Sequence, residues 1–242
     1  MTAKLTAVTI AMTMAMTMTD LAWLLPLSAW LSPAYPVGGF SYSHGLEDAV
    51  DAGRVADWQG LADYVATTLE AGGGWTDMVL LAGSWRAVGD DDALDAVVAL
   101  AAAMRGTAET AMESANQGAA FVLATSAAWP GTPLDAVAAR HDGRVAYAVA
   151  VGIAAAGKSV PLHAALTGYG QAFAANLISA GVRLIPLGQT DGLRALARLA
   201  PVITSCAERA AGTPLDQLGT SAPGIDFCSI RHETQYTRLF RS

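Results

Sequence analysis

Charged residues are scarce in this sequence, and it contains no long linker rich in proline, glycine or serine. Only 14% of its 242 residues are charged and 53% are hydrophobic, whereas an ordinary soluble domain carries roughly 25% charged residues. A single large core can bury much of this apolar surface. The excess also favours either a membrane segment or a permanent protein partner.

A clear membrane-spanning run is also missing, because such a helix needs about 20 consecutive, mainly apolar residues. Residues 145–157 are apolar but lie between Arg144 and Lys158, so they suit a buried core helix. Residues 159–182 carry no formal charge, yet they include several polar side chains and a proline that would be costly in lipid. A membrane-associated helical protein therefore remains only as an alternative.

The first 19 residues combine Lys4 with an apolar run of alternating Met and Thr, which resembles the charged and apolar regions of a signal peptide. No A-x-A cleavage site follows. Because terminal residues are often untied, we predict a disordered extension over residues 1–19 and one helical domain over residues 20–242.

The charge distribution argues against nucleic acid as a partner. Residues 1–100 contain 12 acidic and 3 basic side chains, and residues 101–242 contain 9 acidic and 11 basic ones. This is not the strongly basic surface that phosphate backbones require. Cys206 and Cys228 form neither a C-x-x-C motif nor a disulfide-rich pattern, which agrees with a reducing cytoplasm.

The apolar residues recur three and four apart, and alternating runs typical of strands are almost absent. We therefore predict an all-α fold, a single-domain bundle of about ten helices. The expected helices are 20–31, 43–52, 57–71, 74–88, 91–105, 107–128, 132–140, 143–157, 161–180 and 189–211. The string GTPLD, at 131–135 and 212–216, predicts a helix start with proline at the first helical position.

Gly152 to Ser159 match the phosphate-binding pattern G-x-x-x-x-G-K-[ST], which taken alone indicates a P-loop NTPase. That loop must follow a buried strand, and the residues before Gly157 prefer a helix instead. The alternative interpretation is a helix that ends at Gly157, with Lys158 in solvent and Ser159 capping the next helix. No G-x-S-x-G or H-E-x-x-H motif occurs either, so we predict that the chain is not an enzyme.

Residues 32–47, SPAYPVGGFSYSHGLE, are typical of a turn between two helices. Large amphipathic side chains gather in this turn, namely Tyr35, Phe40, Tyr42 and His44. Such side chains are favoured at interfaces, although they could equally pack over the turn.

Four separated segments resemble the UreF family of urease accessory proteins in the right order. They are residues 32–47, 113–124, 173–192 and 222–242. The resemblance covers residues 20–242 and implies a dimeric, cytoplasmic, helical chaperone or scaffold. It implies the partners UreD (also called UreH), the GTPase UreG and apo-urease, with the assembly inserting nickel into urease. No permanently bound cofactor is expected, since UreG binds the GTP and the complex handles the nickel.

The closing segment combines arginines with aromatic and aliphatic side chains, which is typical of an interface that a partner orders. Packing back on the chain's own core is the alternative. The candidate partner-binding residues are Tyr35, Phe40, Tyr42, His44, Glu47, Arg183, Gln189, Asp191, Arg231, His232, Glu233, Tyr236, Arg238, Leu239, Phe240 and Arg241. Two ligands four apart do not make a stable metal site, so only transient nickel contact is predicted, at His44, Cys228 and His232.

Overall fold

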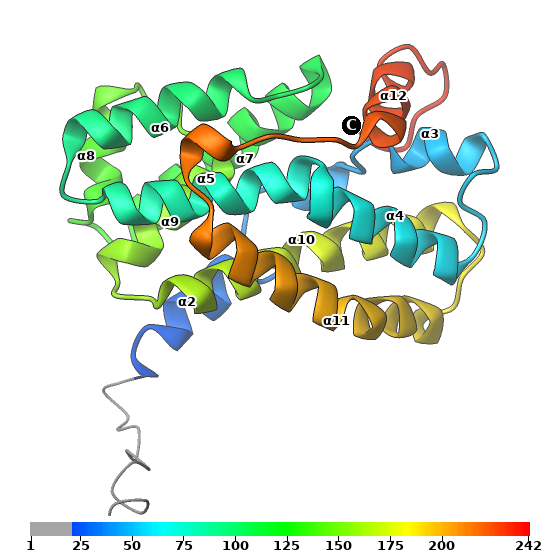
Figure 1. Ribbon diagram of the computed structural model, residues 1–242, viewed down its shortest axis with the longest axis horizontal. Helices are drawn as coiled ribbons and strands as arrows, with labels where there is room; N and C mark the ends of the chain where they lie inside the picture. Colours follow the sequence, from blue (N-terminus) through cyan, green and yellow to red (C-terminus); the bar gives the residue numbers. More distant parts are fainter. Residues whose placement is uncertain (1–20) are drawn as a thin grey trace, which may run out of the picture.

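Helices make up the regular structure of residues 21–242, the part of the chain that the computed structural model describes (Figure 1). The α-helices are α2 (Leu24–Trp30), α3 (Leu46–Asp51), α4 (Trp58–Ala71), α5 (Gly73–Ala87), α6 (Asp91–Ala103), α7 (Ala108–Ala128), α8 (Pro133–Arg140), α9 (Tyr147–Gly157), α10 (Leu162–Leu184), α11 (Gln189–Gly212) and α12 (Pro223–His232). No strand occurs among these residues. The predicted all-α bundle is confirmed, whereas the predicted disordered extension lies outside the described residues.

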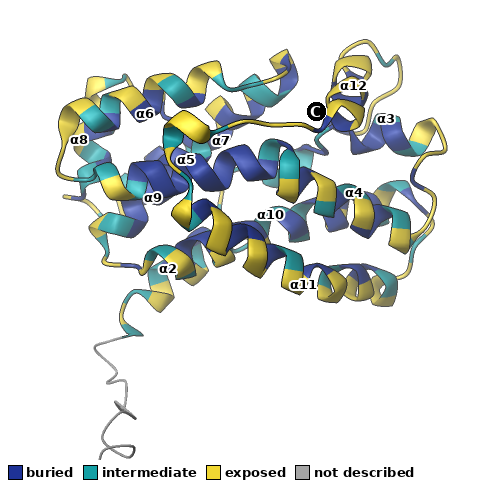
Figure 2. Cartoon of the chain, in the orientation of Figure 1, coloured by how far each residue is buried: buried dark blue, intermediate teal, exposed yellow. Residues whose placement is uncertain are grey.

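The centre of the bundle is α5, which packs against α4, α9, α10 and α11. Its residues from Gly74 to Ser84 are all buried, and Figure 2 shows α5 and α9 as almost continuously buried helices. By contrast, α11 alternates buried and exposed residues along its length (Figure 2), as a helix on the surface of a bundle does. The almost continuous burial of α5 and α9 therefore reflects a central position.

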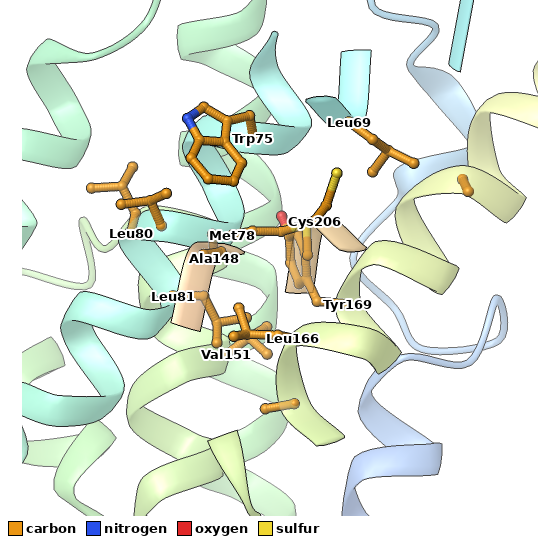
Figure 3. Packing of buried hydrophobic residues seen from close by; sticks show 14 of the residues in the cluster. Leu69, Trp75, Met78, Leu80, Leu81, Ala148, Val151, Leu166, Tyr169 and Cys206 are labelled. Atoms are coloured by element: carbon orange, nitrogen blue, oxygen red, sulfur yellow. The ribbon is translucent and has the colours of Figure 1, made fainter. Parts of the chain in front are cut away.

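Small residues let the central helices approach each other closely. A Cβ atom on Gly152 of α9 would lie 2.5 Å from the carbonyl oxygen of Leu81 on α5, which no side chain could tolerate. Larger apolar side chains fill the space around this contact. Figure 3 shows them converging from α4, α5, α9, α10 and α11, namely Leu69, Trp75, Met78, Leu80, Leu81, Ala148, Val151, Leu166, Tyr169 and Cys206.

The ten predicted helical ranges overlap α2 to α11, but the two GTPLD strings behave differently. The first begins α8, where Asp135 accepts hydrogen bonds from the backbone N–H groups of Gly131 and Thr132. The second begins only a short 3-10 turn, Leu215–Gln217, so that prediction of a helix start is wrong. Leu215 packs on the surface of α5 at Gly83. The chain then runs on without a helix until α12, which was not among the predicted ranges.

The phosphate-binding pattern has no loop in this fold. Gly152 to Gly157 lie within α9, where Gly152 faces α5, and Lys158 is half-buried at the end of the helix. Ser159 has a positive φ of 54°, and α10 begins after Pro161 without a side-chain cap. The expected helix end at Gly157 is confirmed, but the expected cap by Ser159 is wrong. Between Leu21 and Ser242, no helix combines the length and apolar character needed to cross a membrane.

Candidate partner-binding site

Three buried glutamates converge beneath the C-terminal segment of the chain. Glu47 lies on α3, and Glu109 and Glu113 lie one turn apart on α7. Each is less than 8% exposed. Because a buried carboxylate is costly unless it is paired and hydrogen-bonded, these side chains must have nearby donors.

The first donor is His232, which is fully buried near the end of α12. Its Nδ1 lies 2.7 Å from Oε2 of Glu109, and its Nε2 lies 3.2 Å from Oε2 of Glu47. His232 therefore bridges α3 and α7 through its two ring nitrogens.

The same glutamates also hold residues 235–242, here called the tail, which begin shortly after α12 ends at His232. Glu47 accepts the backbone N–H of Leu239 through Oε1 at 2.7 Å and that of Phe240 through Oε2 at 2.8 Å. Glu109 pairs with Arg238, whose Nη1 lies 2.6 Å from Oε1. The tail thus returns to lie beside α3 and α12 (Figure 1).

Ser242 and His44 complete this network. Ser242 is buried, its main-chain oxygen accepts the backbone N–H of Ser43 at 2.8 Å, and its hydroxyl donates to Glu113 at 2.9 Å. Nε2 of His44 lies 3.0 Å from the other oxygen of Glu113. Burial acts to lower the pKa of His44, but the neighbouring Glu113 carboxylate outweighs it and raises that pKa above its ordinary value.

Arg183, at the end of α10, joins the tail to the turn at residues 32–47. Its guanidinium lies over the ring of Phe240, 4.5 Å from the ring centroid, and its Nη2 donates to the carbonyl oxygen of Phe40 at 2.8 Å. The backbone N–H of Arg241 donates to the carbonyl oxygen of Ser41 at 2.8 Å. Two segments that lie about 200 positions apart in the sequence therefore form one surface.

The predicted partner-binding residues divide into anchors and exposed side chains. Tyr42 and Phe240 are buried, and the hydroxyl of Tyr35 bonds that of Thr125 at 2.8 Å while its ring packs on Phe121. Arg231 pairs with Asp48 through three hydrogen bonds, and Glu233 accepts the first N–H of α7. Arg231, Glu233 and Arg238 make their contacts while still exposed. The other exposed side chains are Phe40, Arg183, Gln189, Tyr236, Leu239 and Arg241.

Asp191 is half-buried and pairs with Arg194 at 2.9 Å. The structure places the tail on the chain's own helices, which was the alternative at the sequence level. Whether the exposed side chains bind a partner stays a prediction.

The three residues predicted to touch nickel do not meet. His44 contacts Glu113, and both ring nitrogens of His232 face carboxylates. The sulfur of Cys228 accepts hydrogen bonds from Arg54 at 3.1 Å and Arg231 at 3.5 Å, and burial raises the pKa of this thiol. Within residues 21–242, no group of three or more His, Cys, Asp or Glu side chains is arranged to hold a metal ion.

Sequence reasoning missed Glu109 and Glu113 as site residues. They are the only charged residues of α7, and their spacing of four places them on one face of that helix. That spacing, together with the basic residues of the tail, is the signal that could have found them. The C-terminal residues that they bind lie more than 120 positions away in the sequence, and only the fold brings them together.

A family model and several known proteins that match this chain all carry the same family name. The UreF family model matches residues 55–200. A protein named "Urease accessory protein UreF" from Granulibacter bethesdensis is 54% identical over 226 residues, which are 93% of this chain and 96% of the relative.

Relatives of the same name are found in Rhodopseudomonas palustris and Methylorubrum populi. The first is 50% identical over 223 residues, which are 91% of this chain and 94% of the relative. The second is 47% identical over 220 residues, which are 90% of this chain and 98% of the relative.

Proposed function

The chain belongs to the UreF family of urease accessory proteins, and from this membership we propose that it is a non-catalytic scaffold for urease maturation. In this proposal the chain forms a homodimer in the cytoplasm and binds UreD, also called UreH, and the GTPase UreG. The assembly then delivers nickel to apo-urease. Nickel is the cargo of the complex, and GTP is bound by UreG.

The observation that carries the proposal is the docked tail. The tail is held by the buried carboxylates of Glu47, Glu109 and Glu113, whereas the neighbouring side chains of Phe40, Tyr236 and Leu239 are apolar or aromatic and exposed. Large side chains of this kind beside arginine are typical of the centres of protein interfaces. The docked tail and the turn therefore offer a preformed surface on which a partner could assemble without first ordering the chain.

Gly152 to Gly157, which belong to the nucleotide-binding pattern noted in the sequence, are helical. This agrees with a scaffold rather than a nucleotidase. A P-loop uses the backbone N–H groups of an open loop to cradle phosphates. Here the N–H groups of that segment lie within α9, and a phosphate could not approach Gly152 because α5 covers it. In the proposed complex, phosphate chemistry belongs to UreG.

The test is co-purification of this chain with UreD and UreG, using the full chain and a chain that ends at Thr234. The shorter chain keeps α12 and His232 but loses Arg238, Phe240 and Ser242. We expect the full chain to assemble and to activate urease, and the shorter chain to recover much less of the complex.

Two results would count against the proposal in separate ways. Normal assembly of the shorter chain would remove the tail from the interface, and failure of the full chain to bind either protein would remove the scaffold function. GTP hydrolysis by the purified chain that is lost in Lys158→Ala would show that it is an enzyme after all.

A further inference from the structure

A groove between α4 and α12, here called the α4–α12 groove, is lined by residues within 49–67 and 221–231. The α12 helix packs against α3, and just before α12 the backbone N–H of Ser221 donates to the carbonyl oxygen of Ala71 at the end of α4. This arrangement leaves a volume of about 650 Å³ between α12 and the outer face of α4. Pockets for small molecules usually measure about 300–1,000 Å³. The groove therefore has the size of a small-molecule site.

Much of the lining of this groove is apolar. Apolar or aromatic side chains from three parts of the chain contribute to it, among them Val55, Tyr64, Ile225 and Phe227. The hydroxyl group of Tyr64 already has a partner, because it donates to the carbonyl oxygen of His44 at 2.8 Å. Phe227 is 60% exposed, whereas Val55 and Ile225 are buried. An apolar ligand body in the groove would remove such surface from water, which is favourable.

One positive charge at the groove has no carboxylate of its own. Arg54, whose side chain is 47% exposed, donates from Nη1 to the sulfur of Cys228 at 3.1 Å. Burial raises the pKa of that thiol, so the sulfur carries no charge. The carboxylate of Asp48 lies 3.6 Å from the same nitrogen, but it already accepts three hydrogen bonds from Arg231. Two guanidinium groups thus share one carboxylate.

The other acidic groups near the groove do not balance this charge. Asp63 lines the groove but pairs with Arg198 of α11 at 2.6 Å. Asp226 lies on α12, yet its carboxylate lies toward Gly106, 3.8 Å from where a Cβ atom would stand on that residue. Among residues 21–242, the side chain of Arg54 finds a hydrogen-bond acceptor only for Nη1. Its remaining N–H groups can bind an oxygen anion, and a guanidinium matches a carboxylate through two parallel hydrogen bonds.

We propose that the α4–α12 groove binds a small amphipathic carboxylate. The carboxylate group pairs with Arg54, and the aliphatic body lies against Val55 and Ile225. An uncharged ligand would leave the guanidinium without an anion, and a wholly polar one would leave the apolar lining in water. This site goes beyond the proposed scaffold function and does not depend on it.

The test is titration calorimetry of the full chain with octanoate, a carboxylate with a short aliphatic body. Octan-1-ol and octylamine carry the same body without the negative charge. The variants are Arg54→Gln, which removes the cation, and Thr67→Phe, which fills the groove from α4.

Each variant has a matched control on another part of the surface. Arg144→Gln removes a guanidinium whose side chain is 82% exposed. Thr204→Phe matches Thr67→Phe, because both threonines are exposed on a helix and donate to the carbonyl oxygen four residues earlier. Thermal unfolding without octanoate checks that every variant is folded.

We expect a single octanoate to bind with a dissociation constant of about 1 mM or below, as for a ligand of this size. Octan-1-ol and octylamine should bind about tenfold more weakly, because they cannot accept the charge-assisted hydrogen bonds of Arg54. Arg54→Gln should weaken octanoate binding by a similar factor, and Thr67→Phe should abolish it. Both controls should bind octanoate as the unmodified chain does.

Octan-1-ol binding as tight as that of octanoate would show that the groove selects only apolar bodies, and it would overturn the inference. Octanoate binding that survives Arg54→Gln or Thr67→Phe would place the ligand elsewhere on the chain, with the same consequence. Absence of octanoate binding to the unmodified chain would also overturn the inference. None of these results bears on the scaffold function, which the co-purification with UreD and UreG tests separately.

Discussion

The contact between α5 and α9 and the contact between the tail and α3 and α7 are both buried, but different forces stabilise them. The first is almost entirely apolar, with Gly152 letting two helix backbones meet. The second is built from three carboxylates, two histidines and an arginine. Apolar packing tolerates changes of pH and salt, whereas a buried charge network depends on every partner staying charged and in place. The core can thus persist while the tail is released.

The largest effect is expected from Gly152→Leu, which attacks the apolar contact. The new side chain would meet the backbone of Leu81, and neither helix can move without disturbing the rest of the core. Overpacking usually costs about 1–3 kcal/mol, and a clash with backbone lies at or above the upper end of that range. Denaturant unfolding should show this loss. Gly212→Ala is the control, because nothing lies within 4 Å of the added Cβ atom, and equal stability of both variants would contradict a close contact.

The next effect is expected from His232→Ala, which attacks the charge network. Removing the ring takes one hydrogen-bond partner from each of the buried carboxylates of Glu47 and Glu109, and leaving a buried polar group unsatisfied typically costs about 1–3 kcal/mol. The chain can avoid most of this cost by releasing the tail. We therefore expect faster proteolysis at residues 235–242, with little change in the unfolding temperature of the core.

His163→Ala is the control for that experiment, since His163 is exposed on α10. A tail that stays protected in His232→Ala, or a core that melts together with the tail, would mean that the two regions are not separable.

The smallest effect that we expect is a change with pH in the stabilising contribution of His44, which belongs to the charge network. Because the pKa of His44 is raised in the folded chain, its stabilising contribution is complete below its unfolded pKa of about 6.5. The contribution is lost as pH rises through the folded pKa. Glu113, Asp77 and Arg105 are the charged groups that act on His44.

The measurement is the free energy of unfolding of the unmodified chain and of His44→Gln between about pH 5.5 and pH 8.5, a window around the ordinary histidine pKa. The unmodified chain should be the more stable one at the acidic end, and the difference should shrink as pH rises. A difference that grows with pH would mean that the pKa of His44 is lowered instead.

Much of the core was predictable because its signal is local. The stripe at 57–71 and the N-cap at Asp57 follow from spacing alone, and Asp57 does accept the N–H of Gly60 at 2.8 Å. The second GTPLD string carried the same local signal and failed. There, packing of Leu215 on α5 and the extended path to α12 outweighed the local preference for a helix.

The site was predictable in part. The turn at residues 32–47 and the tail stood out by composition and by resemblance, and the fold brings Phe40, Arg183 and Phe240 together. The division of their residues into anchors and exposed side chains was not predictable. Tyr42 and Phe40 have similar character and lie two positions apart, yet one is buried and the other projects into solvent.

The sequence by itself determined the helical fold class, the family and the two segments that matter, because periodicity, capping residues and motif order are properties of neighbouring positions. Only the tertiary structure decided that the tail lies on its own helices and that Glu109 and Glu113 hold it. The physical reason is that a buried charge is tolerated only beside its partner, and these partners lie more than 120 positions apart in the sequence.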